Sequence, residues 1–379
     1  MKTKRLGETM MDKSVFEKRY SHLQRKLAQE DIRAGLITDP VNLYYLTGWR
    51  TNPHERFTGL LVPKSGRPAL VVPTLDVEAA GVAWVSDIRG WKDGENPYEV
   101  LAGAARASRV MEGSLAVEKA SITLEMYEGV VEALKPARTL DLSRLLNQLR
   151  VIKGQDELEL MQRAADIACK ALDLVCQFIR PGVTEREIAH LLDETMRSFG
   201  ADGPAFETIV LSGVRSALPH GRTGDRAIRA GDLVLIDFGA AYRGYLSDIT
   251  RTFCVGPWPE DLSLIYDAVL AAHDAAMDVV GPGITMEEVD RAARRAIEER
   301  GFGSYFNHRT GHGLGLAIHE EPSFVEGNRQ ELEPGMVGTI EPGVYLPGVG
   351  GVRIEDEVVV TAAGSERLTR CTAERRELG

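Results

Sequence analysis

Two short segments of this chain follow one pattern, 101 residues apart. They read Pro181-Gly-Val-Thr-Glu-Arg-Glu-Ile188 and Pro282-Gly-Ile-Thr-Met-Glu-Glu-Val289. In each, Pro-Gly ends one helix, and a threonine followed by a glutamate at the third position forms a capping box that begins the next helix. The repeat predicts two related α/β halves that face each other. Two similar helix connections that match by coincidence are the alternative.

The length of 379 residues exceeds what one ordinary hydrophobic core supports, so we expect two domains. We place them at residues 13–150 and 151–379. The first reads as an α/β unit that begins with an amphipathic helix over Val15–Gln29. Short apolar runs between turn residues predict its strands at 34–38, 43–48, 58–62, 68–72 and 114–117, with helical segments near 75–83 and 124–134.

The second domain is expected to begin with a long helix that Asp156 can cap and that Pro181-Gly182 stops. Its apolar residues recur three and four positions apart, which is the spacing of a helix with one buried face. Beyond it, further helices alternate with strands to about residue 362.

Composition and charge narrow the class of protein. With 44% hydrophobic and 27% charged residues, the chain is typical of soluble globular proteins. A net charge of −11 and the lack of any Lys/Arg run argue against a nucleic-acid partner. The sequence contains neither a signal peptide nor an apolar run of about twenty residues, so we expect a cytoplasmic protein with no membrane partner. The four cysteines lack the spacing of a metal knuckle and are expected to be buried free thiols.

Two aspartates of the first half of the predicted repeat can meet on one face of a hairpin. Asp237 ends an apolar run, and Asp248 follows eleven residues later, with the turn Tyr242-Arg-Gly-Tyr245 between them. Two antiparallel strands joined in this way would bring the carboxylates side by side, where a cation would offset their repulsion. The alternative is that each aspartate is solvent-exposed at a strand end.

Three further residues with metal-binding side chains come from the second half. His312 lies among Gly311, Gly313 and Gly315, whose lack of a Cβ lets backbone approach a ligand; an incidental histidine in a glycine-rich turn is the alternative. Glu341 precedes Pro342-Gly343, which ends its strand. Glu355 belongs to a charged cluster of the kind that is usually solvated, but the surrounding apolar strand pattern favours an inward position.

Together these residues form a set of four carboxylates and one imidazole. Such an oxygen-rich set suits two bridged divalent cations, with manganese expected first and cobalt or zinc as alternatives. It does not suit a closed structural zinc site, which would prefer cysteine. A pair of metals of this kind holds a hydroxide and polarises a carbonyl, which is the basis of a hydrolase mechanism. His220 and His319 could donate hydrogen bonds to a developing oxyanion, and ordinary surface or core histidines are the alternative.

The ordered set Asp237, Asp248, His312, Glu341 and Glu355, with spacings of 11, 64, 29 and 14 residues, resembles that of the pita-bread metallopeptidases. These include methionine aminopeptidase, aminopeptidase P and prolidase. The preceding domain resembles the creatinase-like, ribonuclease-H-like N-terminal domain of the prolidase and aminopeptidase P branch. The resemblance therefore implies an α/β (α+β) fold in which a C-terminal pita-bread domain follows that N-terminal domain. Creatinase shares this fold without the metal ligands.

The resemblance also implies how the metals are held. Asp237 would chelate one metal, Asp248 and Glu355 would bridge both, and His312 and Glu341 would hold the second. A dinuclear-metal-bound hydroxide would then attack the carbonyl carbon of an Xaa-Pro bond.

Four residues would support the reaction in this family. Glu341 would double as a proton shuttle to the proline nitrogen. His220 and His319 would steady the substrate and the tetrahedral intermediate, and Arg353 would support the site or contact the substrate.

The remaining choice is between a dipeptidase (prolidase), which we favour, and an aminopeptidase P that acts on longer Xaa-Pro peptides. Many prolidases carry an arginine where this chain has Ser323, which puts strict dipeptide selection in doubt. A loop containing His54 and Arg56 resembles one that reaches the active site of the neighbouring subunit in short bacterial prolidases, and a plain surface turn is the alternative. We expect Arg56, and second to it Arg309, to supply the missing charge, in a homodimer. A non-catalytic pita-bread binding protein is a third alternative, disfavoured because no ligand is lost.

Overall fold

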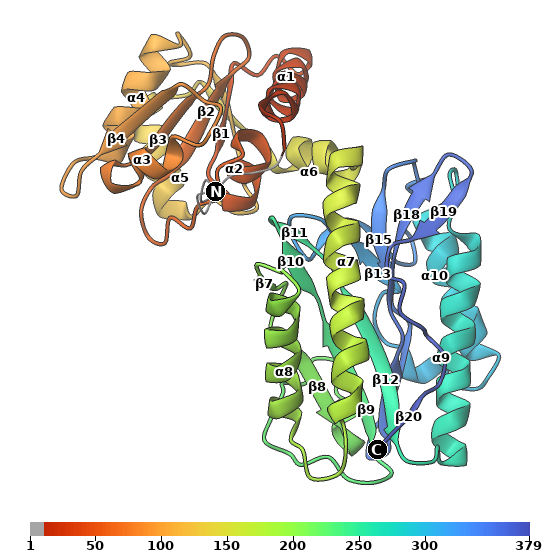
Figure 1. Cartoon of the computed structure of the whole chain (residues 1–379). Coiled ribbons are helices and arrows are strands. Elements are labelled where there is room, and N and C mark those ends of the chain that lie inside the picture. The colour runs from red at the N-terminus through yellow and green to blue at the C-terminus, as the bar shows by residue number, and fades with distance from the viewer. Residues whose placement is uncertain (1–10) are drawn as a thin grey trace. The chain divides into compact units, whose positions relative to one another are not determined.

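The computed structural model describes residues 11–379 (Figure 1). Backbone contacts divide the chain into two compact units, Met1–Arg150 and Val151–Gly379. Each unit contains its own hydrophobic core. No helix within residues 11–379 is both long enough and apolar enough to span a membrane. The four cysteines are free and buried, as expected.

The N-terminal unit is built on a six-stranded mixed sheet with the order β4-β3-β2-β1-β5-β6. Strand β1 pairs antiparallel with β2 and parallel with β5, so the sheet combines a meander with crossover connections. The strands are β1 (Ala34–Ile37), β2 (Gly59–Pro63), β3 (Ala69–Pro73), β4 (Asp87–Trp91), β5 (Ser114–Val117) and β6 (Arg138–Asp141). The prediction of an α/β unit here is confirmed.

Helices flank this sheet. They are α1 (Lys13–Gln29), α2 (Pro40–Thr47), η1 (Thr74–Asp76), α3 (Val77–Ala80), α4 (Pro97–Ala107), α5 (Leu124–Leu134) and α6 (Ser143–Val151). The predicted strand at 43–48 is wrong, because this segment lies in α2. Asp39 caps α2 by accepting hydrogen bonds from the N–H groups of Val41 and Asn42, and Pro40 occupies the first turn. Since Asn42 to Thr47 are all buried, the helix shows no amphipathic period.

The first half of the C-terminal unit is a four-stranded sheet with the order β20-β12-β9-β8 and a small sheet with the order β11-β10-β7. Its strands are β7 (Gly203–Pro204), β8 (Ile209–Ser212), β9 (Leu233–Phe238), β10 (Ala240–Tyr242), β11 (Tyr245–Leu246), β12 (Ile249–Val255) and β20 (Glu377–Leu378). Helices α7 (Gln155–Val175) and α8 (Glu185–Ser198) pack on the larger sheet through one apolar cluster. Short 3₁₀ turns η2 (Cys176–Phe178) and η3 (Gly213–Ala217) complete this half.

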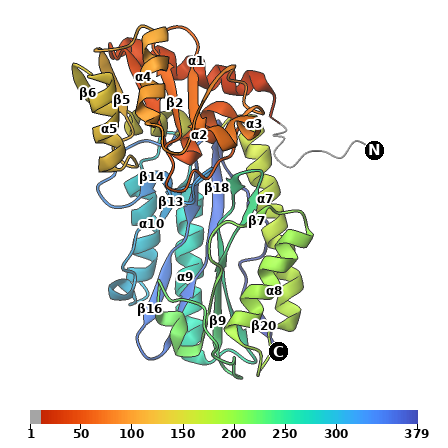
Figure 2. The same cartoon turned by 90° about the vertical axis from the view of Figure 1, so that its left-hand side faces the viewer.

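The second half has the same plan as the first, a sheet covered by two helices. A five-stranded sheet has the order β14-β13-β15-β18-β19, and β16 pairs with β17. The strands are β13 (Gly311–Gly313), β14 (Glu320–Phe324), β15 (Val337–Ile340), β16 (Gly343–Leu346), β17 (Gly350–Arg353), β18 (Asp356–Thr361) and β19 (Gly364–Arg367). Helices α9 (Glu260–Val279) and α10 (Met286–Glu298) cover it, and η4 (Gly303–Tyr305) follows them. In both views, strands of the two sheets lie between the pair α7–α8 and the pair α9–α10 (Figures 1 and 2).

The predicted internal repeat is confirmed in detail. Helices α8 and α10 each begin with a capping box, at Thr184 and Thr285 respectively. The glycine before each threonine is held in the same way: Gly182 N–H donates to the carbonyl of Ile228, and Gly283 N–H donates to that of Leu332, both at 2.9 Å. The details of α7 differ from expectation. Its N-cap is Gly154 rather than Asp156, and it ends at Val175, well before Pro181.

Candidate metal and catalytic site

The five residues singled out as metal ligands line one cavity of about 340 Å³, together with His220, His319 and Arg353. Strands of both halves contribute. Asp237 lies in β9 and Asp248 just before β12, whereas His312 lies in β13, Glu341 just after β15, and Glu355 between β17 and β18. The site is therefore built between the two halves of the C-terminal unit, as the repeat predicts.

The two aspartates line the same cavity because β9 and β12 form an antiparallel pair. Thr250 stands opposite Asp237 in this ladder, so Asp248, two residues earlier, lies near the same end. The chain turns between β10 and β11 at Arg243 and Gly244, whose φ angles are 52° and 89°. Two consecutive left-handed residues favour a tight hairpin turn, with glycine at the second position removing the steric cost. The hairpin predicted from Tyr242–Tyr245 is confirmed.

His312 reaches the cavity because the strands beside it come unusually close. A Cβ on Gly311 would collide with the carbonyl oxygen of Thr339, and one on Gly313 with that of Glu321. The Nδ1 atom of His312 lies 3.0 Å from the carbonyl oxygen of Gly313 and must therefore donate to it. This fixes the tautomer and leaves the lone pair of Nε2 facing the cavity, as in metal-binding histidines.

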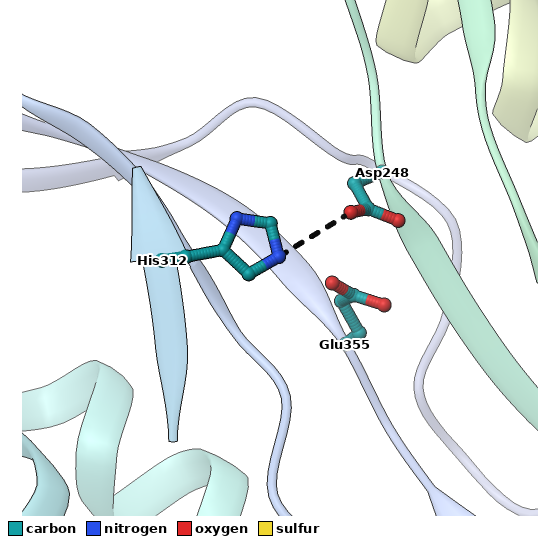
Figure 3. Close-up of side chains that lie close together, drawn as sticks. All are labelled: Asp248, His312 and Glu355. Carbon is teal, nitrogen blue, oxygen red and sulfur yellow. Dashed lines mark ion pairs between the residues drawn. The ribbon is translucent and has the colours of Figure 1, made fainter. Parts of the chain in front are cut away.

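Asp248, His312 and Glu355 form the tightest group. Each offers one ligand atom within 4.8 Å of those of the other two, and all three side chains are buried (Figure 3). His312 Nε2 lies 3.7 Å from a carboxylate oxygen of Asp248 and 3.2 Å from one of Glu341. The first three side chains converge on one point in the cavity, and Glu341 lies beside His312.

Neighbouring groups hold these side chains in place. Thr250 Oγ1 donates to Glu355 at 2.6 Å, and the N–H of Asp248 donates to the Glu357 carboxylate at 2.7 Å. Arg353 uses each of its nitrogens: Nε donates to Thr250 Oγ1, Nη1 to the Tyr345 hydroxyl, and Nη2 to Asp237. Since each of its three nitrogens donates a hydrogen bond, the Arg353 side chain is held in place and positions Asp237.

The carboxylates of the cavity lie so close together that added positive charge would stabilise their ionised forms. Burial raises the pKa of Asp248 and of Glu355, and the nearby carboxylates raise both further. Burial also raises the pKa of Asp237, although Arg353 opposes this shift. Glu341 differs: burial opposes its ionisation, but when the His312 ring is protonated, its Nε2–H hydrogen bond and its charge lower the pKa of Glu341 to about 2. Several carboxylates facing one imidazole nitrogen suit divalent cations, so the residues fit the metal ions that the sequence predicts.

The two auxiliary histidines lie on the wall of this cavity. The ring of His319 meets that of His312 edge to face, with centroids 4.4 Å apart. Burial lowers the pKa of His319, which favours a neutral imidazole that can donate one hydrogen bond. His220 also lines the cavity, from the segment that follows η3.

Known proteins share both units. Residues 159–362 match the family model described as "Metallopeptidase family M24". The chain belongs to metallopeptidase family M24. Residues 19–152 match the model of the "Creatinase/Prolidase N-terminal domain". The predicted fold, a pita-bread domain preceded by a creatinase-like domain, is confirmed, and the family implies that divalent metal ions bind here.

Relatives of this family member cover nearly its whole length. It is 38% identical over 345 residues to an "uncharacterized peptidase" of Staphylococcus aureus strain MSSA476, which spans 91% of this chain and 96% of the relative. An Xaa-Pro dipeptidase from Bacillus anthracis has a TM-score of 0.89 at 36% identity, covering 96% of this chain and 100% of that one. An X-Pro aminopeptidase from Thermotoga maritima MSB8 has a TM-score of 0.87 at 32% identity, covering 95% and 99%.

The loop residues predicted to contact substrate belong to the N-terminal unit. Arg56 donates from Nε and Nη2 to the two carboxylate oxygens of Asp93, each at 3.2 Å, and from Nη1 to Glu55 at 3.0 Å. Its charge is therefore already paired within that unit. His54 lies on an exposed turn with a φ of 50°. A role for either residue in substrate binding stays a prediction.

Among the cavity residues that the sequence analysis did not assign to the site, two are polar, His308 and Tyr345. His308 Nε2 lies 3.0 Å from the Tyr345 hydroxyl, which accepts a hydrogen bond from Arg353, so a chain of contacts runs from His308 to Asp237. The sequence did contain a pattern that could have indicated Tyr345. In an extended segment that starts at Glu341, every second residue shares a face, and Tyr345 is the fourth residue after Glu341. No local pattern distinguished His308.

Proposed function

We propose that this family member hydrolyses the Xaa-Pro bond of dipeptides with the aid of two divalent metal ions. One observation above all supports the proposal: four largely buried carboxylates and an imidazole converge on a cavity whose wall also carries His220 and His319. The apolar side chains of Phe206, Ile209 and Ile318 line the same cavity, which suits the aliphatic ring of a proline.

The donor set divides between two cations as the family resemblance implies. Asp237 would hold one metal, Asp248 and Glu355 would bridge the pair, and His312 and Glu341 would hold the second. When bound, the ions would activate a water molecule and polarise the carbonyl of the scissile bond. Arg353 keeps Asp237 oriented through its hydrogen bond, and Thr250 does the same for Glu355.

Hydrolysis adds a hydroxyl group to the carbonyl carbon and a proton to the proline nitrogen, so one residue must carry that proton. Glu341 is the residue we propose. Its carboxylate lines the cavity, and its Oε1 accepts a hydrogen bond of 3.2 Å from the Thr339 hydroxyl, which fixes its orientation.

His220 and His319 would donate hydrogen bonds to the carbonyl oxygen as it gains negative charge. The lowered pKa of His319 favours a neutral ring, and its contact with His312 keeps it beside the donor set. Both residues would bind the reacting group directly, whereas Arg353 acts through Asp237.

Solved relatives include both a dipeptidase and an aminopeptidase, so the choice of substrate length needs an experiment. Manganese-loaded protein would be offered Ala-Pro and Ala-Pro-Ala at equal concentrations, with release of alanine measured. Cleavage of the dipeptide alone is the expected result. Efficient cleavage of the tripeptide would instead make the protein an aminopeptidase P.

Two further properties belong to the proposal. Manganese is the metal we expect first, with cobalt or zinc as alternatives, and elemental analysis of the purified protein would decide between them. A protein that purifies without stoichiometric metal and cleaves neither peptide would be a non-catalytic binding protein. We also propose a cytoplasmic homodimer, whose mass light scattering would measure.

A further inference from the structure

The catalytic cavity is lined by two arginines whose partners differ. Arg353 is buried, and its donors are engaged by Thr250, Tyr345 and Asp237. Arg309 is half-buried and donates one hydrogen bond, from Nη1 to the hydroxyl of Ser323 at 2.9 Å. Within residues 11–379, no carboxylate forms an ion pair with Arg309. The positive charge of Arg309 therefore lines the cavity, and its hydrogen-bond partner, the Ser323 hydroxyl, is neutral.

Strand pairing explains why Ser323 lies next to Arg309, which lines the cavity. Ser323 stands directly opposite His312 in the antiparallel pair of β13 and β14. Side chains of directly opposed residues project on the same face of a sheet, so Ser323 shares the face from which His312 reaches the cavity. Arg309 is placed beside Ser323 because the next residue, Thr310, donates its N–H to the carbonyl of Phe324 at 3.0 Å.

The charge of Arg309 acts on the reaction side of the cavity. Arg309 lines this cavity together with His319 and His312. The carboxylates of the cavity face the point where the metal ions are proposed to bind. Since Arg309 is paired with the neutral Ser323 hydroxyl, its positive charge is available to bind an anionic group of the substrate.

We infer that Arg309, oriented by Ser323, binds the free α-carboxylate of a dipeptide and so selects dipeptides over longer chains. Nη1 is engaged by Ser323, which leaves the Nε and Nη2 edge of the guanidinium for a bidentate pair with a carboxylate. The Ser323 hydroxyl accepts from Arg309 and keeps its own proton, so it can donate to the same carboxylate. This inference rests on the proposed function.

The same contacts explain how longer peptides would be disfavoured. A third residue would replace the carboxylate beside Arg309 with a neutral amide, and the guanidinium would lose its counter-charge. A site built to pair a charged group rejects an analogue that lacks it, because its own polar groups are left unpaired. Arg56 is less suited to this role, since Asp93 and Glu55 already neutralise it.

The test compares matched ligands that differ only in the carboxylate. Ala-Pro and Ala-prolinamide serve as substrates. Their analogues with a methylene group in place of the scissile carbonyl serve as ligands that cannot be hydrolysed, and calorimetry on the metal-loaded protein measures their binding. The variants are Arg309→Ala, Arg309→Lys and Ser323→Ala. Arg295→Ala, which removes an exposed arginine at the end of α10, is the matched control.

The wild-type protein should bind the carboxylate analogue more tightly than the amide. Arg309→Ala should weaken binding of the carboxylate analogue on the order of 10- to 100-fold, and leave the amide nearly unchanged. Arg309→Lys should keep part of the preference, because it retains the charge without the fork. Ser323→Ala should cost a few-fold, about the value of a neutral hydrogen bond. Arg295→Ala should behave as the wild type.

Equal binding of the two analogues by the wild type, or a preference that survives Arg309→Ala, would overturn the inference. If the preference disappears in Arg56→Ala instead, the carboxylate site belongs to the N-terminal loop. Failure of the proposed function gives a different result: the wild type would cleave neither Ala-Pro nor Ala-prolinamide. The calorimetric comparison would still decide the role of Arg309 in that case.

Discussion

Arg251 donates a hydrogen bond of 2.7 Å to the carboxylate of Asp356, and both side chains are buried. Arg251 also donates to the main-chain carbonyl of Glu355 at 2.5 Å and to that of Cys371 at 2.7 Å. His273 lies on the other side of Asp356, with Nε2 3.0 Å from its second carboxylate oxygen. This ion pair joins β12 to the start of β18, next to Glu355, which lines the cavity.

Replacing Arg251 should therefore destabilise the C-terminal unit strongly. Without Arg251, the buried Asp356 carboxylate keeps only its contacts with His273, Arg367 and Thr369. Because these contacts offset part of the loss, we expect a cost of about 3 kcal/mol, the lower end of the range for breaking a buried ion pair. We expect Arg251→Met to lower the free energy of unfolding of the metal-free protein by that amount in urea denaturation. Arg295→Met, at an exposed position, should change it little. A loss below about 1 kcal/mol for Arg251→Met would mean that the pair contributes little to stability.

Metal binding should depend on Asp248. Manganese should raise the melting temperature of the wild type, because a ligand that binds only the folded state stabilises it. We expect Asp248→Asn to abolish this rise. The metal-free variant should be at least as stable as the metal-free wild type, because burial and neighbouring carboxylates disfavour the charge of Asp248. Asp278→Asn, which removes an exposed carboxylate from α9, should keep the metal-induced rise. An undiminished rise in Asp248→Asn would remove Asp248 from the donor set.

His319 should contribute to the rate more than to binding. A donor that stabilises a developing oxyanion typically contributes 10²- to 10³-fold to kcat. We expect His319→Ala to lower kcat for Ala-Pro on the order of 100-fold, with a smaller change in KM. His190→Ala alters an exposed histidine of α8 and should leave both parameters unchanged. A larger effect on KM than on kcat would assign His319 to substrate binding.

The sequence predicted what local patterns encode. The capping boxes at Thr184 and Thr285, and the hairpin turn at Arg243-Gly244, depend on residues within a few positions of one another. The five proposed donors, which the structure brings to one cavity, were singled out because each lies in a short segment with its own turn or strand pattern. Their arrangement into two halves followed from the repeat.

The sequence could not predict what depends on tertiary contacts. Arg251 reaches Asp356 and Cys371 over more than a hundred residues, and no local pattern marks such partners. The hydrogen bond from Arg309 to Ser323 appears only once β13 and β14 are paired. Segment 43–48 was mistaken for a strand because burial on every side of α2 hides the helical period.

Glu118 should make the stability of the N-terminal unit depend on pH. Burial raises the pKa of this carboxyl from 4.5 to about 7, although it accepts hydrogen bonds from the N–H groups of Thr38 and Asp39 and from the Asn42 side chain. A raised pKa means that the folded state favours the protonated form. The stabilisation is therefore complete below pH 4.5 and is lost as the pH rises through about 7. The loss between pH 4.5 and pH 8 would be at most about 3 kcal/mol.

Urea denaturation at pH 5 and pH 8, followed by tryptophan fluorescence, would measure this effect. Trp49, Trp84 and Trp91 all lie in the N-terminal unit, so they report chiefly on its unfolding. We expect Glu118→Gln to show a smaller loss of stability between the two pH values than the wild type, because its side chain cannot ionise. Glu132→Gln, at an exposed position of α5, should keep the loss of the wild type. If Glu118→Gln and the wild type lose the same free energy, the pH dependence arises from other groups, and the hydrogen bonds to Glu118 keep it ionised throughout.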